Sequence, residues 1–413
     1  MKEGMSIRDA SLPPPLSPAG VIYTAATREA PLLAEFAADI MARGWRVGGL
    51  VQRTFRGPDG FKQKIVATEL DTGRRVTLAT YKGDRTRESV CGFDTAALAE
   101  ATGAVRRAVA ARMDLIVIEK FSRQETDGEG LLDEILSAMA EGIPTITLLS
   151  SEVVEEWTRL TGGLATLIPA ERQAVWRWWG PHRLYRDLEL GVGRGNARNV
   201  VVGFNWVLVE GPHGCGLAQT PDRGSAGSRR VADAARLAGR PLRELAARVH
   251  SWDPVEAAIG LAAINAFYNR YDLEGPADNG LDAFAGEAPL TVIGRFPDLA
   301  ARLPGARIIE RQPREGEYPD AAAGWLLPES ERVVATASTL VNHSLPGLIA
   351  AAPHARIALV GPSTPLTPRL LAYGLDRLAG MVVTDPKGAA RAVAEGGSVR
   401  TLKSYARMAM LRA

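Results

Sequence analysis

The C-terminal part of the chain alternates short apolar runs with polar loops and helical stretches. Over residues 289–413 the apolar runs are LTVIG, RIIE, RVVATA, RIALVG and MVVTD. Buried parallel strands have this Val- and Ile-rich composition, and strands that alternate with helices form right-handed βαβ units. The spacing therefore predicts a five-stranded parallel, Rossmann-like sheet over residues 285–413.

A second alternating pattern runs over residues 20–180. Strands are expected at GVIYTAA, RVGGLVQRT, DLIVIEKF and IPTITLLS, and a hairpin at ATELDTGRRVTLAT with its turn at residues 71–73. Helices are expected at EAPLLAEFAADIMARG, DTAALAEATGAVRRAVAARM and GLLDEILSAMAEG. We therefore expect an α/β layer domain here, preceded by a mobile leader rich in Pro and Ser at residues 1–19.

Residues 181–275 lie between these segments and combine strands and helices in a different order. Two strands, VVVGFNWVLVE and GLAQT, are joined through GPHGCG and followed by helices at PLRELAARVH and DPVEAAIGLAAINAFYNR. Asp253 is a good N-cap for the second helix, and Pro254 suits its first position. The pattern predicts a small α+β domain.

The charge balance and the apolar pattern exclude some classes of partner. The 413 residues include 49 Lys and Arg against 47 Asp and Glu, so no overall field attracts nucleic acid or a membrane surface. No apolar stretch reaches the ~18 residues of a membrane helix, and the N-terminus lacks the apolar segment of a secretory signal. Two cysteines, Cys91 and Cys215, suit a reducing compartment. We expect a cytoplasmic protein and leave a homo-oligomer open.

Polar and turn-forming residues follow all five C-terminal strands. Ligands of open parallel sheets bind outside the carboxyl ends of the strands. Hydroxyl groups and backbone N–H groups in such loops suit an anion or a carboxylate. The candidate ligand-binding residues, in chain order, are Gly294, Phe296, Glu310, Thr336, Asn342, His343, Gly361, Ser363, Thr364 and Asp385.

Longer motifs in the same segments resemble a known family. VIGRFPDL, VVATASTLVNHSLPGLI and GPSTPLTPRLLAYGLDRLAG are similar to the bacterial and archaeal heavy-metal chelation domain family. Members of that family join an enolase N-terminal-like domain to a Rossmann-like domain, and VVVGFNWVLVE, GCGLAQTP and WDPVEAAIGLAAINAFYN resemble the enolase-like half. The resemblance implies a pocket between the two halves, with a role in binding a metal or a chelate.

The N-terminal segment resembles a P-loop nucleoside-triphosphatase domain, specifically a small bacterial domain of unknown function allied to the nucleoside-triphosphatase kinases. The resemblance rests on GWRVGGLVQR, VCGFDTAALAE and DLIVIEKFSRQETDGEG. A phosphate-binding loop needs glycines, a lysine and a hydroxyl. The matching stretch YTAATREAPLL has no glycine or lysine, and Glu29 stands near the lysine position, where a carboxylate would repel phosphate. We expect a degenerate domain that does not favour nucleotide.

Several side chains are candidates for holding a metal. His213 and Cys215 offer an imidazole and a thiolate two residues apart, which suits zinc, copper or nickel. A protein-ligated site needs at least three ligands, and His343 is a candidate third; the alternative interpretation is a turn with a buried cysteine. In the N-terminal domain, Glu119, Glu125 and Asp127 are candidates for a cation, with solvated carboxylates as the alternative.

The sequence leaves three functions open. The first is a protein that binds a small anionic ligand or metal chelate between the enolase-like and Rossmann-like halves, in the handling of a metal such as molybdenum or in metal-cofactor assembly. The second is an enzyme acting on a small carboxylated or phosphorylated metabolite, with Asn342, His343 and Ser363 as site residues. The third is a nucleotide-binding or hydrolysing N-terminal domain. No cofactor is identified, and a transition metal or metal chelate is the candidate.

Overall fold

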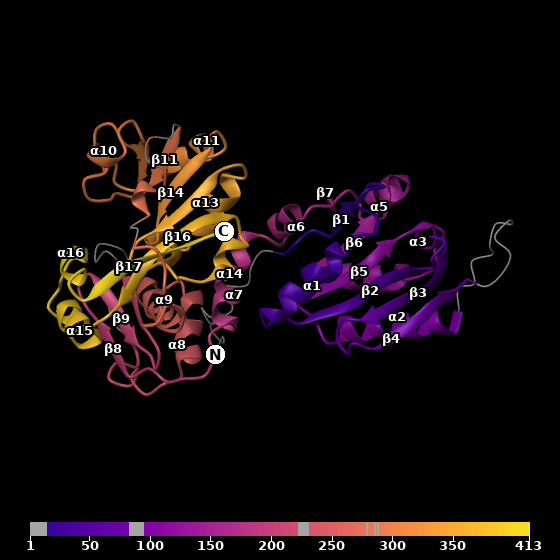
Figure 1. The fold of residues 1–413 in the computed structure, drawn as a ribbon, viewed down its shortest axis with the longest axis horizontal. Helices are drawn as coiled ribbons and strands as arrows, with labels where there is room; N and C mark the ends of the chain where they lie inside the picture. The colour runs from indigo at the N-terminus through magenta and orange to yellow at the C-terminus, as the bar shows by residue number, and fades with distance from the viewer. Residues whose placement is uncertain (1–14, 82–94, 222–230, 278–279, 285, 287–288) are drawn as a thin grey trace, which may run out of the picture. The chain divides into compact units, whose positions relative to one another are not determined.

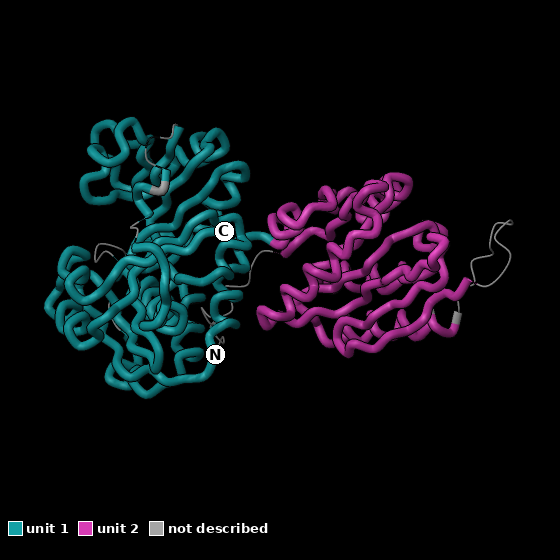
Figure 2. The backbone as a smooth tube through the Cα atoms, in the orientation of Figure 1, with its two compact units in different colours: residues 1–13, 180–413 teal, residues 14–179 magenta. Residues whose placement is uncertain are grey.

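The chain folds into two compact units, Pro14–Trp179 and Gly180–Ala413 (Figure 2). The computed structural model describes residues 15–81, 95–221, 231–277, 280–284, 286 and 289–413. Most of the expected leader, and Cys91, lie outside the described residues. Each unit is built on a seven-stranded, mostly parallel sheet with helices packed against it (Figure 1), which confirms the predicted α/β fold class.

The sheet of the N-terminal unit has the order β4-β3-β2-β5-β6-β1-β7. The five strands from β2 to β7 in this order are parallel, whereas β3 and β4 add an antiparallel hairpin at one edge. The hairpin turns at residues 70–74, as predicted. The strands are β1 Ala19–Ile22, β2 Val47–Arg56, β3 Lys62–Glu69, β4 Arg75–Thr80, β5 Leu115–Phe121, β6 Thr145–Leu149 and β7 Thr166–Pro169.

Helices of the N-terminal unit bury their apolar faces on this sheet. Aromatic side chains fix α6 on α1, since the Phe36 and Trp176 rings meet edge to face with centroids 5.4 Å apart. Trp45 makes a similar contact with Trp179 at 5.1 Å. The helices are α1 Leu32–Ala42, α2 Thr95–Ala110, α3 Arg123–Thr126, α4 Leu132–Ala140, α5 Val154–Leu160 and α6 Arg172–Trp179.

The larger sheet of the C-terminal unit has the order β13-β12-β11-β14-β15-β16-β17. Numbered along its own segment, this is 3-2-1-4-5-6-7, which begins with the six-strand order of the dinucleotide-binding fold. The five predicted strands are present, and β17 adds an antiparallel strand beside β16 that the sequence analysis missed. The strands are β11 Leu290–Ile293, β12 Arg307–Glu310, β13 Tyr318–Pro319, β14 Arg332–Thr336, β15 Arg356–Val360, β16 Leu375–Val383 and β17 Ala406–Arg412.

Short helices connect these strands, as βαβ units require. The longest, α15, starts from Asp385, whose side chain accepts a hydrogen bond from the Gly388 N–H at 3.0 Å. The helices of this half are α10 Leu299–Arg302, α11 Ala323–Leu326, α12 Ser338–Val341, α13 Leu345–Ala351, α14 Pro368–Leu371, α15 Pro386–Ala394 and α16 Val399–Leu402.

The enolase-like half carries a three-stranded antiparallel sheet in the order β10-β9-β8. The single strand predicted over residues 200–210 is wrong, because the chain turns at Gly203, whose N–H donates to the Trp206 carbonyl at 2.9 Å. Asn205 holds the tip of this turn by donating to the Gly396 carbonyl at 2.7 Å. The elements are β8 Asn199–Val202, β9 Trp206–Glu210, β10 Cys215–Gln219, α7 Leu184–Leu190, α8 Leu242–Ala246 and α9 Pro254–Tyr268.

Helix α9 is the centre of the enolase-like half. Its residues from Ala257 to Ala266 are all buried, and all except Asn265 are apolar or glycine, which is typical of a helix enclosed by other elements. Asp253 caps it by accepting from the Val255 N–H at 2.9 Å, as predicted. The helix lies directly on β10, where a Cβ built on Gly216 would stand 2.0 Å from the Ala262 carbonyl oxygen.

The contact at Gly216 predicts a large loss of stability on substitution. Gly216→Ala places a methyl group against helix backbone that has no room to move, and we expect a cost of at least about 3 kcal/mol. Gly347→Ala is the matched control, since this helical glycine has no neighbour within 4 Å of a built Cβ. The control should gain up to about 1 kcal/mol. Calorimetry of the full chain measures both, and equal effects would contradict the expectation.

Candidate functional site

The carboxyl ends of β11 and β14 lie side by side where the strand order reverses, and this is the position of the ligand site in folds of this class. Gly294 ends β11 with a φ of +91°, and a Cβ there would stand 2.4 Å from Cγ2 of Thr336. The Thr336 hydroxyl oxygen accepts a hydrogen bond from the Ser338 hydroxyl at 3.2 Å. The structure thus brings Gly294 and Thr336 together, while Phe296 is half-buried against the core nearby.

Charged side chains beyond β11 and β12 are paired with each other. The Arg295 guanidinium donates to both carboxylate oxygens of Glu317, at 3.1 and 2.6 Å, and this hydrogen bonding lowers the pKa of Glu317 to about 2. Glu310, at the end of β12, is half-buried and accepts a hydrogen bond from the Arg311 N–H at 3.0 Å.

His343 joins the Rossmann-like half to the enolase-like half. Its backbone has a φ of +59°, and its Nε2 lies 2.7 Å from the Val249 carbonyl oxygen, which requires a proton on Nε2. The ring lies against Tyr185 and Trp252, with centroids 4.8 and 5.0 Å away. Burial lowers the pKa of His343. Trp252, 59% exposed, is a feature that the sequence analysis missed.

The proline-flanked loop after β15 is buried against helix α9. Ser363 is 2% exposed, and its hydroxyl oxygen accepts from the Gln219 N–H of β10 at 2.9 Å. The Asn265 amide donates to the Ser363 carbonyl at 3.0 Å, and the Asn269 amide to the Thr364 carbonyl at 3.0 Å. Asn269 also accepts from the Leu366 N–H at 2.8 Å. The Ser363 hydroxyl and the backbone of this loop therefore belong to a joint between the halves.

The remaining candidates at this edge have local partners. Gly361 donates its N–H to the Ala379 carbonyl at 2.9 Å. Asn342 is exposed, and its side-chain oxygen accepts from the N–H and the hydroxyl of Ser344 at 3.0 and 2.7 Å. Asp385 is exposed and caps α15. The Thr364 hydroxyl is buried and lacks a hydrogen-bond partner among the described residues.

The predicted metal ligands His213 and Cys215 have opposite environments. His213 is exposed on the loop between β9 and β10, whereas Cys215 is 1% exposed in an apolar cluster with Trp206 and Met381. Burial raises the pKa of the Cys215 thiol, and the Glu210 carboxylate raises it further. A thiol held in its protonated form is a poor metal ligand. Among the residues that the structure describes, no three His, Cys, Asp or Glu side chains form a metal-binding group.

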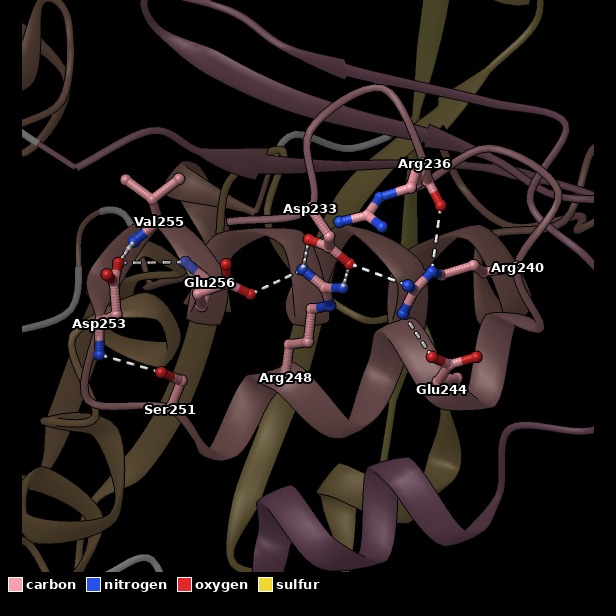
Figure 3. A network of polar contacts seen from close by, with 9 residues as sticks. All are labelled: Asp233, Arg236, Arg240, Glu244, Arg248, Ser251, Asp253, Val255 and Glu256. Carbon is pink, nitrogen blue, oxygen red and sulfur yellow. Dashed lines mark hydrogen bonds and ion pairs between the residues drawn. The ribbon is translucent and has the colours of Figure 1, made fainter. Parts of the chain in front are cut away.

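Acidic side chains around helix α9 are held by arginines (Figure 3). Arg248 donates to both carboxylate oxygens of Asp233 and to Glu256 at 2.8 Å. Arg240 joins the same network through Asp233 and Glu244. Hydrogen bonding by Arg248 lowers the pKa of Asp233. These contacts attach the segment after residue 230 to α8 and α9, so the carboxylates have a structural role.

The four carboxylates of the N-terminal unit that the sequence analysis named lie in different environments. Glu29 pairs with Arg56 through both Nε, at 3.1 Å, and Nη2, so its charge is compensated. Glu125 caps the short helix α3, accepting from the N–H and the hydroxyl of Ser122 at 2.8 Å each. Glu119 is half-buried at the end of β5, and burial raises its pKa to about 7. Asp127 is exposed.

Family comparisons cover nearly all of the described chain. A model described as "Protein of unknown function (DUF2478)" matches residues 18–178. Models DUF4213 and DUF364, both described as "Putative heavy-metal chelation", match residues 185–268 and 280–412. A DUF364-family protein of unknown function from Desulfitobacterium hafniense is 33% identical; the match covers 56% of this chain and 98% of that one, with a TM-score of 0.51. This chain belongs to the DUF364 family. It carries the family's two-domain arrangement behind an N-terminal DUF2478 domain.

Two further similarities are more limited. A protein named molybdenum import ATP-binding protein ModC 2, from Bradyrhizobium diazoefficiens, is 42% identical over 148 residues; the match covers 36% of this chain and 16% of the relative's length. The structure of THEP1 from Aquifex aeolicus matches 42% of this chain and 94% of its own length, at 14% identity and a TM-score of 0.29. Within the described residues, no helix combines the length and the apolar character needed to cross a bilayer.

The environment of His343 predicts a pH dependence. Because burial lowers its folded-state pKa below the ordinary 6.5, the unfolded chain binds the proton more tightly. The neutral His343 ring therefore contributes to the free energy of unfolding above pH 6.5, and this contribution is lost as the pH falls below 6.5. NMR titration should give a His343 pKa below 6.5. His343→Asn, which tolerates the left-handed backbone, should reduce the loss of stability between pH 7 and pH 5. The exposed His354→Asn is the control, and a pKa above 6.5 would contradict the expectation.

Glu119 predicts the opposite pH dependence for the N-terminal unit. The folded-state pKa of Glu119 is about 7 and lies above the ordinary 4.5, so the folded protein binds the proton more tightly than the unfolded chain. The protonated side chain therefore contributes to the free energy of unfolding below pH 4.5, and this contribution is lost as the pH rises through 7. Glu119→Gln should therefore stabilise this unit at pH 8 by about 2 kcal/mol and change little at pH 4.5. Calorimetry at the two pH values, with the exposed Glu129→Gln as control, measures the effect. A variant less stable than the wild type at pH 8 would refute it.

Proposed function

We propose that residues 180–413 bind a small anionic ligand or metal chelate at the carboxyl edge of the Rossmann-like sheet, beside the enolase-like half. The contact between Gly294 and Thr336 at the reversal of strand order carries this proposal. Because Gly294 has no side chain, the loop after β11 passes directly over the end of β14, next to the hydroxyls of Thr336 and Ser338. Ligands of doubly wound sheets bind at this position.

Residues from both halves support the same location. His343 follows β14 and α12, and its ring contacts Trp252 of the enolase-like half. Trp252 is 59% exposed and is therefore accessible to a ligand, and the exposed Asn342 directly precedes His343 in the chain. An exposed aromatic ring beside amide and hydroxyl groups is typical of a small-molecule site.

The chemistry of the donors favours a chelate over a bare ion as the ligand. Cys215 faces the core with its thiol protonated, and His213 is exposed to solvent, so these two do not fit a shared metal centre. A chelated metal arrives with most of its ligands and needs anion-holding groups from the protein. The family description as heavy-metal chelation supports a role in metal handling, and the molybdenum import relative makes molybdenum the first metal to assay.

Elemental analysis of the full chain tests the proposal. The protein is purified without a metal-affinity tag from cells grown with added molybdate, and bound metal is measured by mass spectrometry beside native mass spectrometry of any retained small molecule. We expect the affinity for the metal or chelate to fall about thirtyfold in Thr336→Val combined with Trp252→Ala, with a matching loss of occupancy, since each substitution loses a contact worth about 1 kcal/mol.

Two control variants distinguish this site from the hairpin between β9 and β10, which carries His213 and Cys215. His354→Ala, at the opposite edge of the sheet before β15, and Cys215→Ala should keep the wild-type occupancy. Metal lost in Cys215→Ala but retained in the Thr336 and Trp252 double variant would contradict the proposal and assign the ligand to the hairpin between β9 and β10. Protein that retains no metal and no small molecule would also contradict it.

A further inference from the structure

A second pocket lies within the N-terminal unit, at the carboxyl ends of three neighbouring parallel strands. It has a volume of about 590 Å³, which is within the usual range for small-molecule sites. Its walls come from the segments after β1, β5 and β6. These three strands are neighbours in the sheet, in the order β5-β6-β1. The lining residues that carry or offset charge are Tyr23, Arg28, Lys120, Arg123, Glu152 and Glu156.

Three cationic side chains line this pocket. Arg28 comes from the segment after β1, and Lys120 and Arg123 come from the end of β5 and the helix α3 that follows. The Lys120 ammonium lies 5.4 Å from the centre of the Tyr23 ring. Among the described residues, neither the Arg28 nor the Arg123 guanidinium donates a hydrogen bond to a carboxylate, although Arg28 interacts electrostatically with the adjacent Glu29 and helps to lower its pKa. Arginine forks that are not hydrogen-bonded to a protein carboxylate are suited to oxyanions.

The acidic residues near the pocket compensate little of this charge. Glu156 is paired with Arg159, whose Nε donates to it at 2.9 Å, and this hydrogen bonding lowers the pKa of Glu156. Glu29, next to Arg28 in the chain, is not part of the lining and forms an ion pair with Arg56. Glu152 is the remaining acid of the lining and is exposed. The pocket therefore keeps an excess of positive charge.

Glu125 fixes the backbone that presents two of the polar groups. Its carboxylate accepts from the Ser122 N–H and hydroxyl at 2.8 Å each, and from the Leu131 N–H at 3.2 Å. It is 4% exposed and closes a capping box on α3. The Glu125 carboxylate therefore fixes the turn from which Arg123 and Thr126 project.

We propose that this pocket binds a phosphate group or another tetrahedral oxyanion through Arg28, Lys120 and Arg123. Side-chain cations here replace the glycine-rich backbone and the lysine of a phosphate-binding loop, which the segment after β1 lacks. The pocket is larger than one oxyanion needs, so a phosphorylated small molecule also fits it. The phosphate group is the shared chemistry of these ligands.

Calorimetric titration of the full chain with inorganic phosphate, and separately with ATP, tests the proposal. Binding of either probe should weaken about tenfold in Arg28→Ala and in Arg123→Ala, the loss expected for one charge-assisted hydrogen bond. Lys120→Met, which keeps the aliphatic stem over Tyr23, should weaken it similarly. The matched control is Arg112→Ala, which removes an exposed arginine ion-paired with Glu141 at the opposite end of β5.

The two probes also identify the source of the phosphate group. Binding of both in the wild type, reduced by the three pocket variants, supports a site for free oxyanion. Binding of ATP alone with the same dependence supports a phosphorylated ligand. Binding that persists in all three variants, that falls equally in Arg112→Ala, or that is absent for both probes would overturn the proposal. Far-UV circular dichroism of each variant confirms that a loss of binding is not a loss of folding.

Discussion

Two buried asparagines, Asn265 in helix α9 and Asn269 at its C-terminal cap, hold the C-terminal unit together. Asn269 donates to the carbonyls of Thr364 and Met381 and accepts from the Leu366 N–H, while Asn265 donates to the carbonyls of Leu217 and Ser363. Backbone groups buried in this way lose much stability if their partner is removed. The loop after β15 and the strand β10 are thereby attached to one helix, and the carboxyl edge of the Rossmann-like sheet is placed against the enolase-like half.

Close packing makes this arrangement possible. An asparagine side chain is short, so α9 has to lie almost on the backbone of its neighbours before an amide reaches a carbonyl. Gly216 allows that approach on β10. The candidate ligand site then lies beside the joint and not within it, because Ser363 and its loop already have partners in α9 and β10. Gly294 and Thr336 lie at the same edge, and Trp252 of the enolase-like half contacts His343, which follows β14 and α12.

The sequence predicted what local pattern determines. Apolar runs gave the parallel strands, and Asp253 with Pro254 gave the start of α9, because both signals act within a few residues. Contacts between residues far apart in the chain could not be predicted from local pattern. The turn at Gly203, for example, is held by contacts with the chain near residue 396. Ser363 suggested a ligand because the partner of its hydroxyl, the Gln219 N–H of β10, is far away in sequence. Asn265 and Asn269, four residues apart on an otherwise apolar helix, were a signal of a buried polar contact.

The pairing of Glu29 with Arg56 has a consequence for substitution at position 29. A lysine introduced at position 29 would stand beside the Arg56 guanidinium, so two cations would repel each other where an ion pair now holds the segment after β1 to β2. A lysine at position 29 would therefore require a second substitution at position 56. Each partner of this ion pair thus constrains substitution of the other.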